Sequence, residues 1–265
     1  MPHLIATKMK KYSLLFFILT FLQCTTTAPD AGQLHEAHET AIEASYRTPE
    51  IDSTRLNVAF LIMDGVYNTE LTAPYDIFQH TIFRDSIQSM NTFLVANTLN
   101  PITSFEGIRM LPDYDYTKDD LPPIDVLVVP SAEHHLDTDL EDEAMIAFVQ
   151  KADKEAQYIT SHCDGAFVLA KAGLLNDVVS TTFPSDIDRM REMFPDLDIR
   201  KDVLFVHDGK YITSAGGAKS FEAALYLAEL LYGAPIARRL AKGLVIDWDV
   251  AEVPHLVIEE TVSMD

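Results

Sequence analysis

The stretch QYITSHCDGAFVLAKA at residues 157–172 decides the fold of this chain. Its first part, 157–161, has the composition of a buried strand, and its last part, 165–172, is typical of a helix. Cys163 lies at the junction, and Gly165 lets the helix begin close to the strand. The stretch therefore predicts a nucleophile elbow, which is a tight strand-to-helix turn that lifts one side chain above a sheet.

Segments of the same two kinds alternate along the rest of the chain. Further apolar runs typical of buried strands are 57–63, 92–96 and 124–130. Helical periodicity recurs in 71–82, 141–155, 219–232 and 234–242, and Asp208-Gly209 inside 203–213 predicts the turn of a hairpin. The alternation predicts the α/β class, as a three-layer α/β/α sandwich with a flavodoxin-like, mostly parallel sheet. Ligands of such sheets bind at the carboxyl ends of the strands, where Cys163 lies.

Composition and charge exclude several classes of protein. Hydrophobic residues make up 48% of the 265, which is enough for a packed core. The chain has 20 Lys plus Arg against 41 Asp plus Glu, a formal net charge of −21. Because phosphate contacts need clustered cations, we expect no nucleic acid partner. The two Cys exclude a disulfide scaffold and a Cys-rich zinc module.

The N-terminus has the features of an export signal. Lysines without any acid precede an apolar run at 14–22 that is too short to span a bilayer comfortably. Residues 1–24 resemble a bacterial lipoprotein signal in which Cys24 is lipidated, and a cleaved signal followed by an incidental Cys is the alternative. Residues 25–54 are polar and acidic and predict a tether, and 55–265 are the predicted folded domain. We therefore expect a location in the bacterial cell envelope, with membrane contact through the lipid anchor only.

An ordered set of motifs resembles the PfpI/ThiJ-like group of the class I glutamine amidotransferase-like superfamily. The motifs are Asp64-Gly65, Glu70-Leu-Thr-Ala-Pro74, Val128-Val-Pro-Ser131, the elbow with Gly173-Leu-Leu, Ser180-Thr-Thr-Phe-Pro184, and the run from Asp208-Gly209 to Gly216 with the helix that follows it. Leu244-Val-Ile-Asp-Trp-Asp249 is similar to the tail of the isonitrile-hydratase-like branch. The resemblance extends from Val58 to Trp248 and implies the same α/β fold.

The resemblance also implies roles for the residues at matching positions. Cys163 takes the position of the nucleophile, and Glu70 takes that of the acidic residue that touches the nucleophile sulfur. A protonated carboxyl group there can donate a hydrogen bond and later serve as acid or base. The helix N-terminus beside the sulfur favours the thiolate. Backbone N–H groups near Ala132 and Asp164 are expected to face a developing oxyanion.

The sequence departs from the group at several of these positions. Phe183 stands in the segment where relatives commonly carry His, which argues against an ordinary amidase or peptidase. A carboxylate at Asp164, directly after the nucleophile, would raise the thiol pKa. Either His134 or His135 faces the sulfur, or both are solvated loop residues. Their spacing matches no defined metal pattern, so we predict no metal and no other cofactor. The expected pocket consists of Ala132, His134, His135, His162, Asp164 and Phe183.

These features predict a cysteine-dependent enzyme that acts on a small electrophile. In the group this implies hydration of an isonitrile, glyoxalase or deglycase chemistry on α-oxoaldehyde adducts, or hydrolysis of an amide. The missing His favours the first two, which in the group can rely on a Cys–acid pair. The alternative is a non-catalytic ligand-binding or redox-sensing lipoprotein on the same fold. Many relatives dimerise, so we also expect a homodimer.

Overall fold

A single mixed sheet forms the centre of the protein. The computed structural model describes residues 49–258, so the predicted signal peptide and most of the predicted tether lie outside the described residues. The strand order across the sheet is β12 (His255–Ile258), β10 (Phe205–Asp208), β11 (Tyr211–Ser214), β7 (Tyr158–His162), β6 (Val126–Val129), β1 (Leu56–Leu61), β2 (Met90–Ala96) and β5 (Tyr114–Asp115). The strands from β11 to β5 are parallel, and β10 runs antiparallel to β11. The prediction of a mostly parallel sheet is confirmed.

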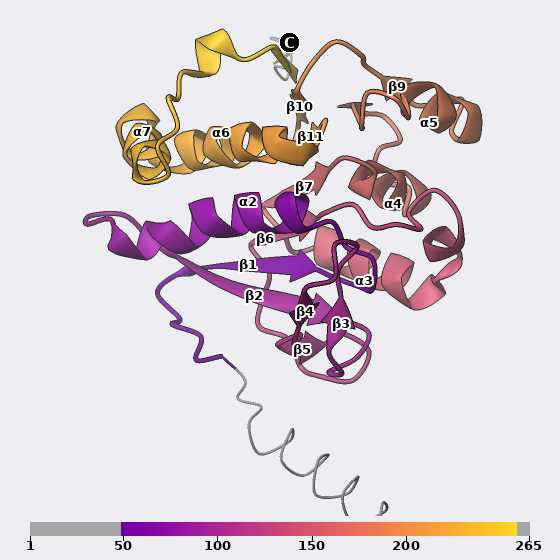
Figure 1. Ribbon diagram of the computed structural model, residues 1–265, viewed down its shortest axis with the longest axis horizontal. Helices are drawn as coiled ribbons and strands as arrows, with labels where there is room; N and C mark the ends of the chain where they lie inside the picture. Colours follow the sequence, from indigo (N-terminus) through magenta and orange to yellow (C-terminus); the bar gives the residue numbers. More distant parts are fainter. Residues whose placement is uncertain (1–48, 259–265) are drawn as a thin grey trace, which may run out of the picture. The chain divides into compact units, whose positions relative to one another are not determined.

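Helices cover both faces of this sheet (Figure 1). One layer contains α2 (Asn68–Gln79), α6 (Ser220–Tyr232) and α7 (Ala234–Gly243), which pack against one another. The other contains α3 (Glu143–Asp153) and α4 (Gly165–Lys171), and α5 (Ile187–Met193) packs into the same core. Each layer buries its own apolar cluster against the sheet. All six residues of β1 are buried, as a central strand between two helical layers requires. The predicted three-layer α/β/α sandwich is therefore confirmed.

The boundaries of several predicted elements differ from those observed. The predicted helix 71–82 begins three residues earlier, as α2, and ends in the 3₁₀ turn η1 (His80–Phe83). The predicted helix 141–155 is split into the 3₁₀ turn η2 (Thr138–Glu141) and α3, because Asp142 caps α3 by accepting from the N–H groups of Ala144 and Met145, at 3.0 Å each. The sequence pattern missed β5, β12 and the two-residue strands β3 (Ile102–Thr103), β4 (Arg109–Met110), β8 (Val179–Ser180) and β9 (Asp198–Ile199).

The carboxyl ends of the parallel strands bring four chain segments to one edge of the sheet. Cys163 follows β7, Ser131 follows β6, and Gly216 follows β11. The segment after β1 leads into α2, whose first turn carries Glu70. Glu70 accepts hydrogen bonds from the N–H groups of both Ser131 and Gly217, which ties three of these segments together. This edge is the location expected for a ligand in an open α/β sheet.

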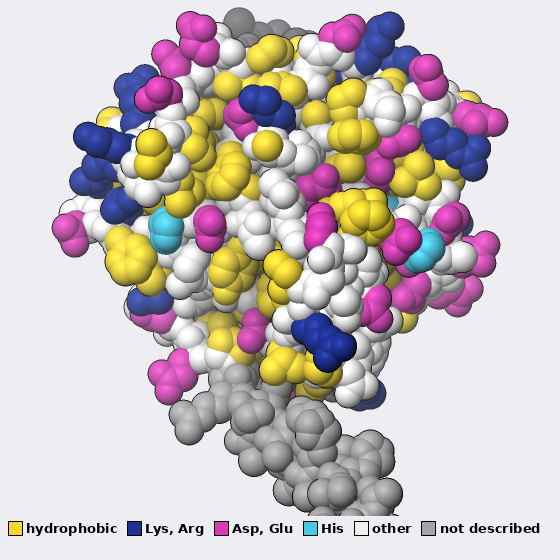
Figure 2. Space-filling model, in the orientation of Figure 1, with side chains coloured by type: hydrophobic (Ala, Val, Ile, Leu, Met, Phe, Trp, Pro, Cys, Tyr) yellow, Lys and Arg dark blue, Asp and Glu magenta, His cyan; other side chains and the backbone are white. Residues whose placement is uncertain are grey.

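The surface of the described part of the chain is predominantly acidic in character. Figure 2 shows Asp and Glu side chains spread over most of the face that it presents. Among residues 49–258, no helix is both long enough and apolar enough to cross a membrane.

Candidate active site

Cys163 occupies a strained backbone position between β7 and α4. Its φ is +53°, in the left-handed region that side chains other than glycine rarely adopt. The Cys163 N–H donates to the carbonyl oxygen of Ser214, at 3.0 Å, and the Thr182 hydroxyl donates to the carbonyl oxygen of Cys163, at 2.9 Å. These two hydrogen bonds hold the turn in a conformation that the chain would otherwise avoid. The predicted elbow geometry is thus present at this residue.

Two glycines make the elbow sterically feasible. A Cβ at Gly165 would lie 2.1 Å from the carbonyl oxygen of Val129 in β6. A Cβ at Gly216 would lie 2.3 Å from the Cβ of Cys163, and Gly216 also has a φ of +76°. Both positions therefore require glycine, so that α4 and the segment after β11 can approach the turn closely.

Glu70 lies against the sulfur of Cys163 in a buried position. Its side chain is 5% exposed. One carboxyl oxygen accepts from the Gly217 N–H at 3.0 Å and the other from the Ser131 N–H at 3.2 Å. Burial raises the pKa of Glu70, and the hydrogen bonds from Gly217, Cys163 and Ser131 partly oppose that rise. The structure thus brings together the two residues that the resemblance placed at the centre of the site.

Asp164 adds a second carboxyl group to the same sulfur. It occupies the N-cap position of α4, yet its side chain makes no capping hydrogen bond. The carboxyl group instead lies 3.2 Å from the Thr182 hydroxyl and in contact with the Cys163 thiol. Burial, followed by the charge of Asp186, raises the pKa of Asp164 to about 7.

The sulfur between these two carboxyl groups is a thiol at neutral pH. Burial is the main cause that raises the pKa of Cys163, and the negative charges of Glu70 and Asp164 raise it further. The Asp164 N–H and the Ser131 side chain oppose the rise without cancelling it. The expectation that the helix N-terminus would favour the thiolate is therefore wrong: α4 is only seven residues long, and burial beside two acids outweighs its dipole.

The histidines of the expected pocket are engaged with other partners. His135 is fully buried, and its Nδ1 accepts from the Ala132 N–H at 3.2 Å while its Nε2 lies 3.2 Å from the Met63 sulfur. Burial lowers its pKa to about 3, so the ring is neutral. His134 is half-exposed and pairs with Asp137 at 3.3 Å. Neither contact involves the Cys163 sulfur, so neither imidazole ring is placed to act as a base toward it.

His162 and the Ala132 N–H also have hydrogen-bond partners within the protein. His162 is buried in β7, and its Nδ1 lies 2.9 Å from the Ser214 hydroxyl. Burial lowers the pKa of His162 to about 3. Because the Ala132 N–H already donates to His135, it is not free to receive an oxyanion in this structure. The expected oxyanion site consequently lacks one of its two named donors.

Two residues near the sulfur were not among those singled out from the sequence. Tyr67 directly precedes α2, and its pKa is raised by burial and then by the charges of Cys163, Glu70 and Asp164. Its ring packs on Phe105 at a centroid distance of 4.6 Å, and Phe105 itself is exposed between β3 and β4. Thr182 stands beside Phe183, which is exposed. The sequence around Tyr67 does not indicate a place in the site. Its contact with Phe105 depends on the long connection that contains β3 and β4.

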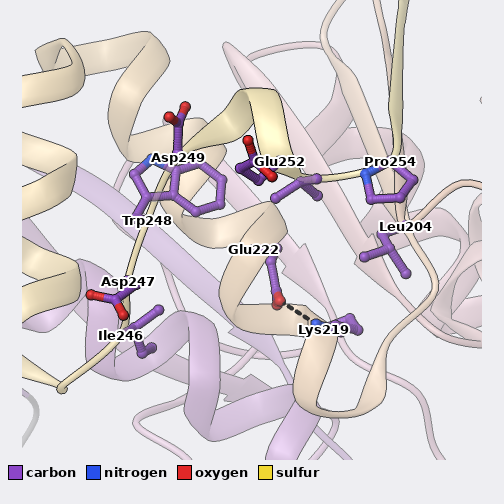
Figure 3. Close-up of a pocket in the computed structure, with 10 residues that line it drawn as sticks. Leu204, Lys219, Glu222, Ile246, Asp247, Trp248, Asp249, Glu252 and Pro254 are labelled. Atoms are coloured by element: carbon purple, nitrogen blue, oxygen red, sulfur yellow. Dashed lines mark hydrogen bonds and ion pairs between the residues drawn. The ribbon is translucent and has the colours of Figure 1, made fainter.

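Access to the sulfur is narrow. Cys163 is 6% exposed, and Glu70 and Asp164 are 5% and 8% exposed. A cavity of about 490 Å³ lies elsewhere, between the start of α6 and the segment 246–254 (Figure 3). Lys219 lines it and pairs with Glu222 at 2.6 Å. The 3₁₀ turn η3 (Gly217–Lys219) thus separates this cavity from Glu70.

The described residues offer no metal site. Among residues 49–258, no group of three or more His, Cys, Asp or Glu side chains is placed to hold a metal ion.

Replacing Asp164 by asparagine is expected to stabilise the protein at neutral pH by about 3 kcal/mol. The folded protein raises the pKa of Asp164 to about 7 from an ordinary value of 3.8. Between about pH 4 and about pH 7 the unfolded chain loses this proton while the folded chain keeps it, so wild-type stability falls as the pH rises. The Asp164→Asn variant has no carboxyl group at this position, so its stability does not decrease in this way. Urea unfolding of both proteins from about pH 4 to about pH 8 measures the difference between their free energies of unfolding. A difference that does not increase with pH would contradict the raised pKa of Asp164.

Comparison with known proteins agrees with this geometry. A model of the DJ-1/PfpI family matches residues 56–230. The chain belongs to the DJ-1/PfpI family. It is 31% identical over 184 residues to a Pseudomonas putida protein named isonitrile hydratase, which covers 69% of this chain and 75% of that protein. It is 32% identical over 103 residues to the HTH-type transcriptional regulator CdhR of Pseudomonas aeruginosa, covering 39% of this chain and 30% of that protein.

Solved structures of the family share the fold. The crystal structure of a THiJ/PfpI family protein from Pseudomonas syringae superposes with a TM-score of 0.64 at 24% identity, covering 77% of this chain and 84% of that one. Drosophila melanogaster DJ-1beta gives a TM-score of 0.62 at 22% identity, covering 73% of this chain and 100% of that one. The flavodoxin-like α/β architecture is therefore that of its relatives.

Proposed function

We propose that this protein is a cysteine-dependent hydratase that converts an isonitrile into an N-substituted formamide. The observation that carries the proposal is the buried contact of Glu70 with the thiol of Cys163 at a strained elbow. The similarity to a protein named isonitrile hydratase supports the choice of substrate class. Cys163 is 6% exposed, and a linear isonitrile group needs little lateral space to reach a buried sulfur.

The reaction adds one water molecule to the isonitrile carbon in two stages. In the first, the sulfur of Cys163 bonds to that carbon, the thiol proton passes to the Glu70 carboxylate, and a neighbouring protonated acid, which regains its proton from water in the second stage, protonates the carbon, giving a thioformimidate. In the second, water adds to the same carbon, the nitrogen is protonated, and the carbon–sulfur bond breaks to release the formamide and the thiol. Glu70 is suited to the transfers at the sulfur because it already touches that atom.

The hydrogen bonds of the oxyanion-side loop favour this reaction over amide hydrolysis. Acyl transfer and attack on an α-oxoaldehyde both develop negative charge on oxygen, which needs free N–H donors. The Ala132 N–H is bonded to His135, and the Ser131 N–H is bonded to Glu70. Addition of a thiol to an isonitrile carbon, the first stage of the proposed reaction, develops no such oxyanion. The partnered amides are therefore compatible with a hydratase and unfavourable for a hydrolase.

Turnover of a small alkyl isonitrile tests the proposal. We expect the wild-type protein to form the formamide, followed by proton NMR, and Cys163→Ala to form none above the uncatalysed rate. Glu192→Gln, which removes an exposed carboxylate in α5, serves as the control and should retain full activity. Equal rates for the wild type and Cys163→Ala would contradict the proposal, as would turnover of an α-oxoaldehyde in place of the isonitrile.

A non-catalytic ligand-binding or redox-sensing role is the second candidate. The raised pKa of the Cys163 thiol favours it, because a thiol is a weaker nucleophile than a thiolate. A binding domain should show saturable thermal stabilisation by a small ligand without any product. A redox sensor should accumulate sulfenic or sulfinic acid at Cys163 under mild peroxide.

We also propose that the protein is a homodimer held at the bacterial cell envelope by a lipid on Cys24. The sequence pattern of residues 1–24 supports the anchor. Cys24→Ala should release the protein from the membrane fraction, and unchanged fractionation of that variant would refute the anchor.

A further inference from the structure

We infer that Asp164 is a second catalytic acid, which delivers the proton to the substrate carbon while Glu70 takes the proton of the thiol. This inference rests on the proposed function, and it deepens that function by dividing the acid and base roles between two carboxyl groups.

The placement of the Asp164 side chain departs from what its position in the chain favours. An Asp at a helix N-cap ordinarily accepts a hydrogen bond from a backbone N–H of the first turn. Asp164 makes no such bond to α4. Its carboxyl group is directed instead to the Thr182 hydroxyl and the Cys163 thiol, and it is 8% exposed. The Asp164 side chain therefore lies beside the sulfur instead of capping α4.

The Thr182 hydroxyl lies within hydrogen-bond distance of two oxygen atoms. The hydroxyl has one hydrogen, and its oxygen lies 2.9 Å from the carbonyl oxygen of Cys163, which can only accept. Asp164 Oδ1 lies 3.2 Å from the same hydroxyl oxygen. The hydroxyl can donate its one hydrogen to either oxygen, and when it donates to the carbonyl, a protonated Asp164 completes the second hydrogen bond by donating to the hydroxyl oxygen. The network therefore suits a protonated Asp164.

The two carboxyl groups lie in different surroundings, which separates their roles. Glu70 accepts from two backbone N–H groups, which favour its ionised form. The ionisable groups that face Asp164 are Asp186, Glu70, Cys163 and Tyr67, and none of them carries a positive charge. Its burial and these negative neighbours favour the protonated form, and the hydrogen bonds with Thr182 and Cys163 oppose this without cancelling it. Two buried acids with different hydrogen-bond partners are a usual arrangement for an acid and a base in one site.

The proton transfers balance over one turnover. At the start, Asp164 is protonated, Glu70 is ionised and Cys163 is a thiol. On addition, the sulfur bonds to the isonitrile carbon, Asp164 protonates that carbon, and Glu70 takes the thiol proton. Water then adds to the carbon as Asp164 recovers a proton from it, and Glu70 gives its proton to the nitrogen. Finally the carbon–sulfur bond breaks, and the hydroxyl proton returns to the sulfur through Glu70.

The pH profile of kcat/KM for the alkyl isonitrile tests the inference. In the wild type, activity should fall as the pH rises through the titration of Asp164, since the acid must be protonated. Asp164→Asn should lower kcat/KM about 10²-fold and remove this alkaline limb. Asp186→Asn, which removes a negative charge that faces Asp164 without contacting the sulfur, should keep the maximal rate and move the limb to lower pH.

The outcomes separate this inference from the proposed function. Wild-type turnover with an unchanged rate and profile in Asp164→Asn would overturn the inference alone. If Asp164→Asn does not fold, the Asp186→Asn profile decides, and an unmoved alkaline limb there would overturn it. A wild-type protein with no isonitrile turnover would overturn the proposed function and this inference with it.

Discussion

Replacing Glu70 by glutamine should reduce kcat/KM for the isonitrile about 10²–10⁴-fold, the range associated with loss of an acid–base group. The amide keeps an oxygen that can accept one backbone N–H, so the fold of the first turn of α2 should survive. It cannot take the thiol proton, however, and the thiol pKa is too high for spontaneous ionisation at neutral pH. The loss should therefore appear in kcat rather than in KM.

The pH profile of the same variant gives an independent check. In the wild type, activity should fall at low pH as Glu70 becomes protonated, because its raised pKa brings this limb above the ordinary range for Glu. Glu70→Gln should lack that limb. Glu192→Gln is the matched carboxylate control. A Glu70→Gln protein with wild-type kcat and an intact acid limb would show that another group receives the thiol proton.

Replacing Gly165 by alanine should have a large effect on folding, a destabilisation of about 3 kcal/mol or more. The added Cβ would lie 2.1 Å from the Val129 carbonyl oxygen and 3.0 Å from its carbonyl carbon. Both neighbours are backbone atoms of a buried central strand, so neither can move aside cheaply. The whole of α4 must shift away from β6, which also displaces Cys163. We expect a large drop in the urea midpoint, with a loss of turnover in the fraction that still folds.

Gly209→Ala provides the control for this prediction. Gly209 lies in the turn between β10 and β11 with a φ of +60°, and a Cβ there would meet nothing within 4 Å. That variant should lose only about 1 kcal/mol, from backbone strain alone. Equal effects of the two substitutions would show that close packing at Gly165 is not what holds the elbow.

The elements of the fold that the sequence predicted are those with strong periodicity. The strands at 57–63 and 124–130 read as mainly apolar runs because helices cover both sides of β1 and β6. The strands β3, β4, β8 and β9 were missed because two residues carry no period. β12 was missed because it lies at the edge of the sheet and its residues are only partly buried.

The candidate site was predictable where the motif is local and not where it depends on distant contacts. Cys163 and Gly165 are adjacent in a recognisable turn. The hydrogen bond from the Ala132 N–H to His135 could not be predicted from the sequence. It depends on the position of the His135 imidazole ring, which contacts Met63 after β1 and Asp139 of the 3₁₀ turn η2. The raised thiol pKa likewise reflects burial, which the pattern of a helix N-terminus does not reveal.

The pH dependence of Cys163 alkylation by iodoacetamide, read from the Cys163 peptide by mass spectrometry, tests the central claim most directly. That claim is that carboxyl groups, rather than a histidine, control the proton on the sulfur. We predict an apparent thiol pKa above about 8.5 in the wild type, and a lower one in Glu70→Gln, which should alkylate faster at neutral pH while turning over substrate more slowly. A wild-type value below the ordinary range, or one that is the same in both proteins, would contradict the account.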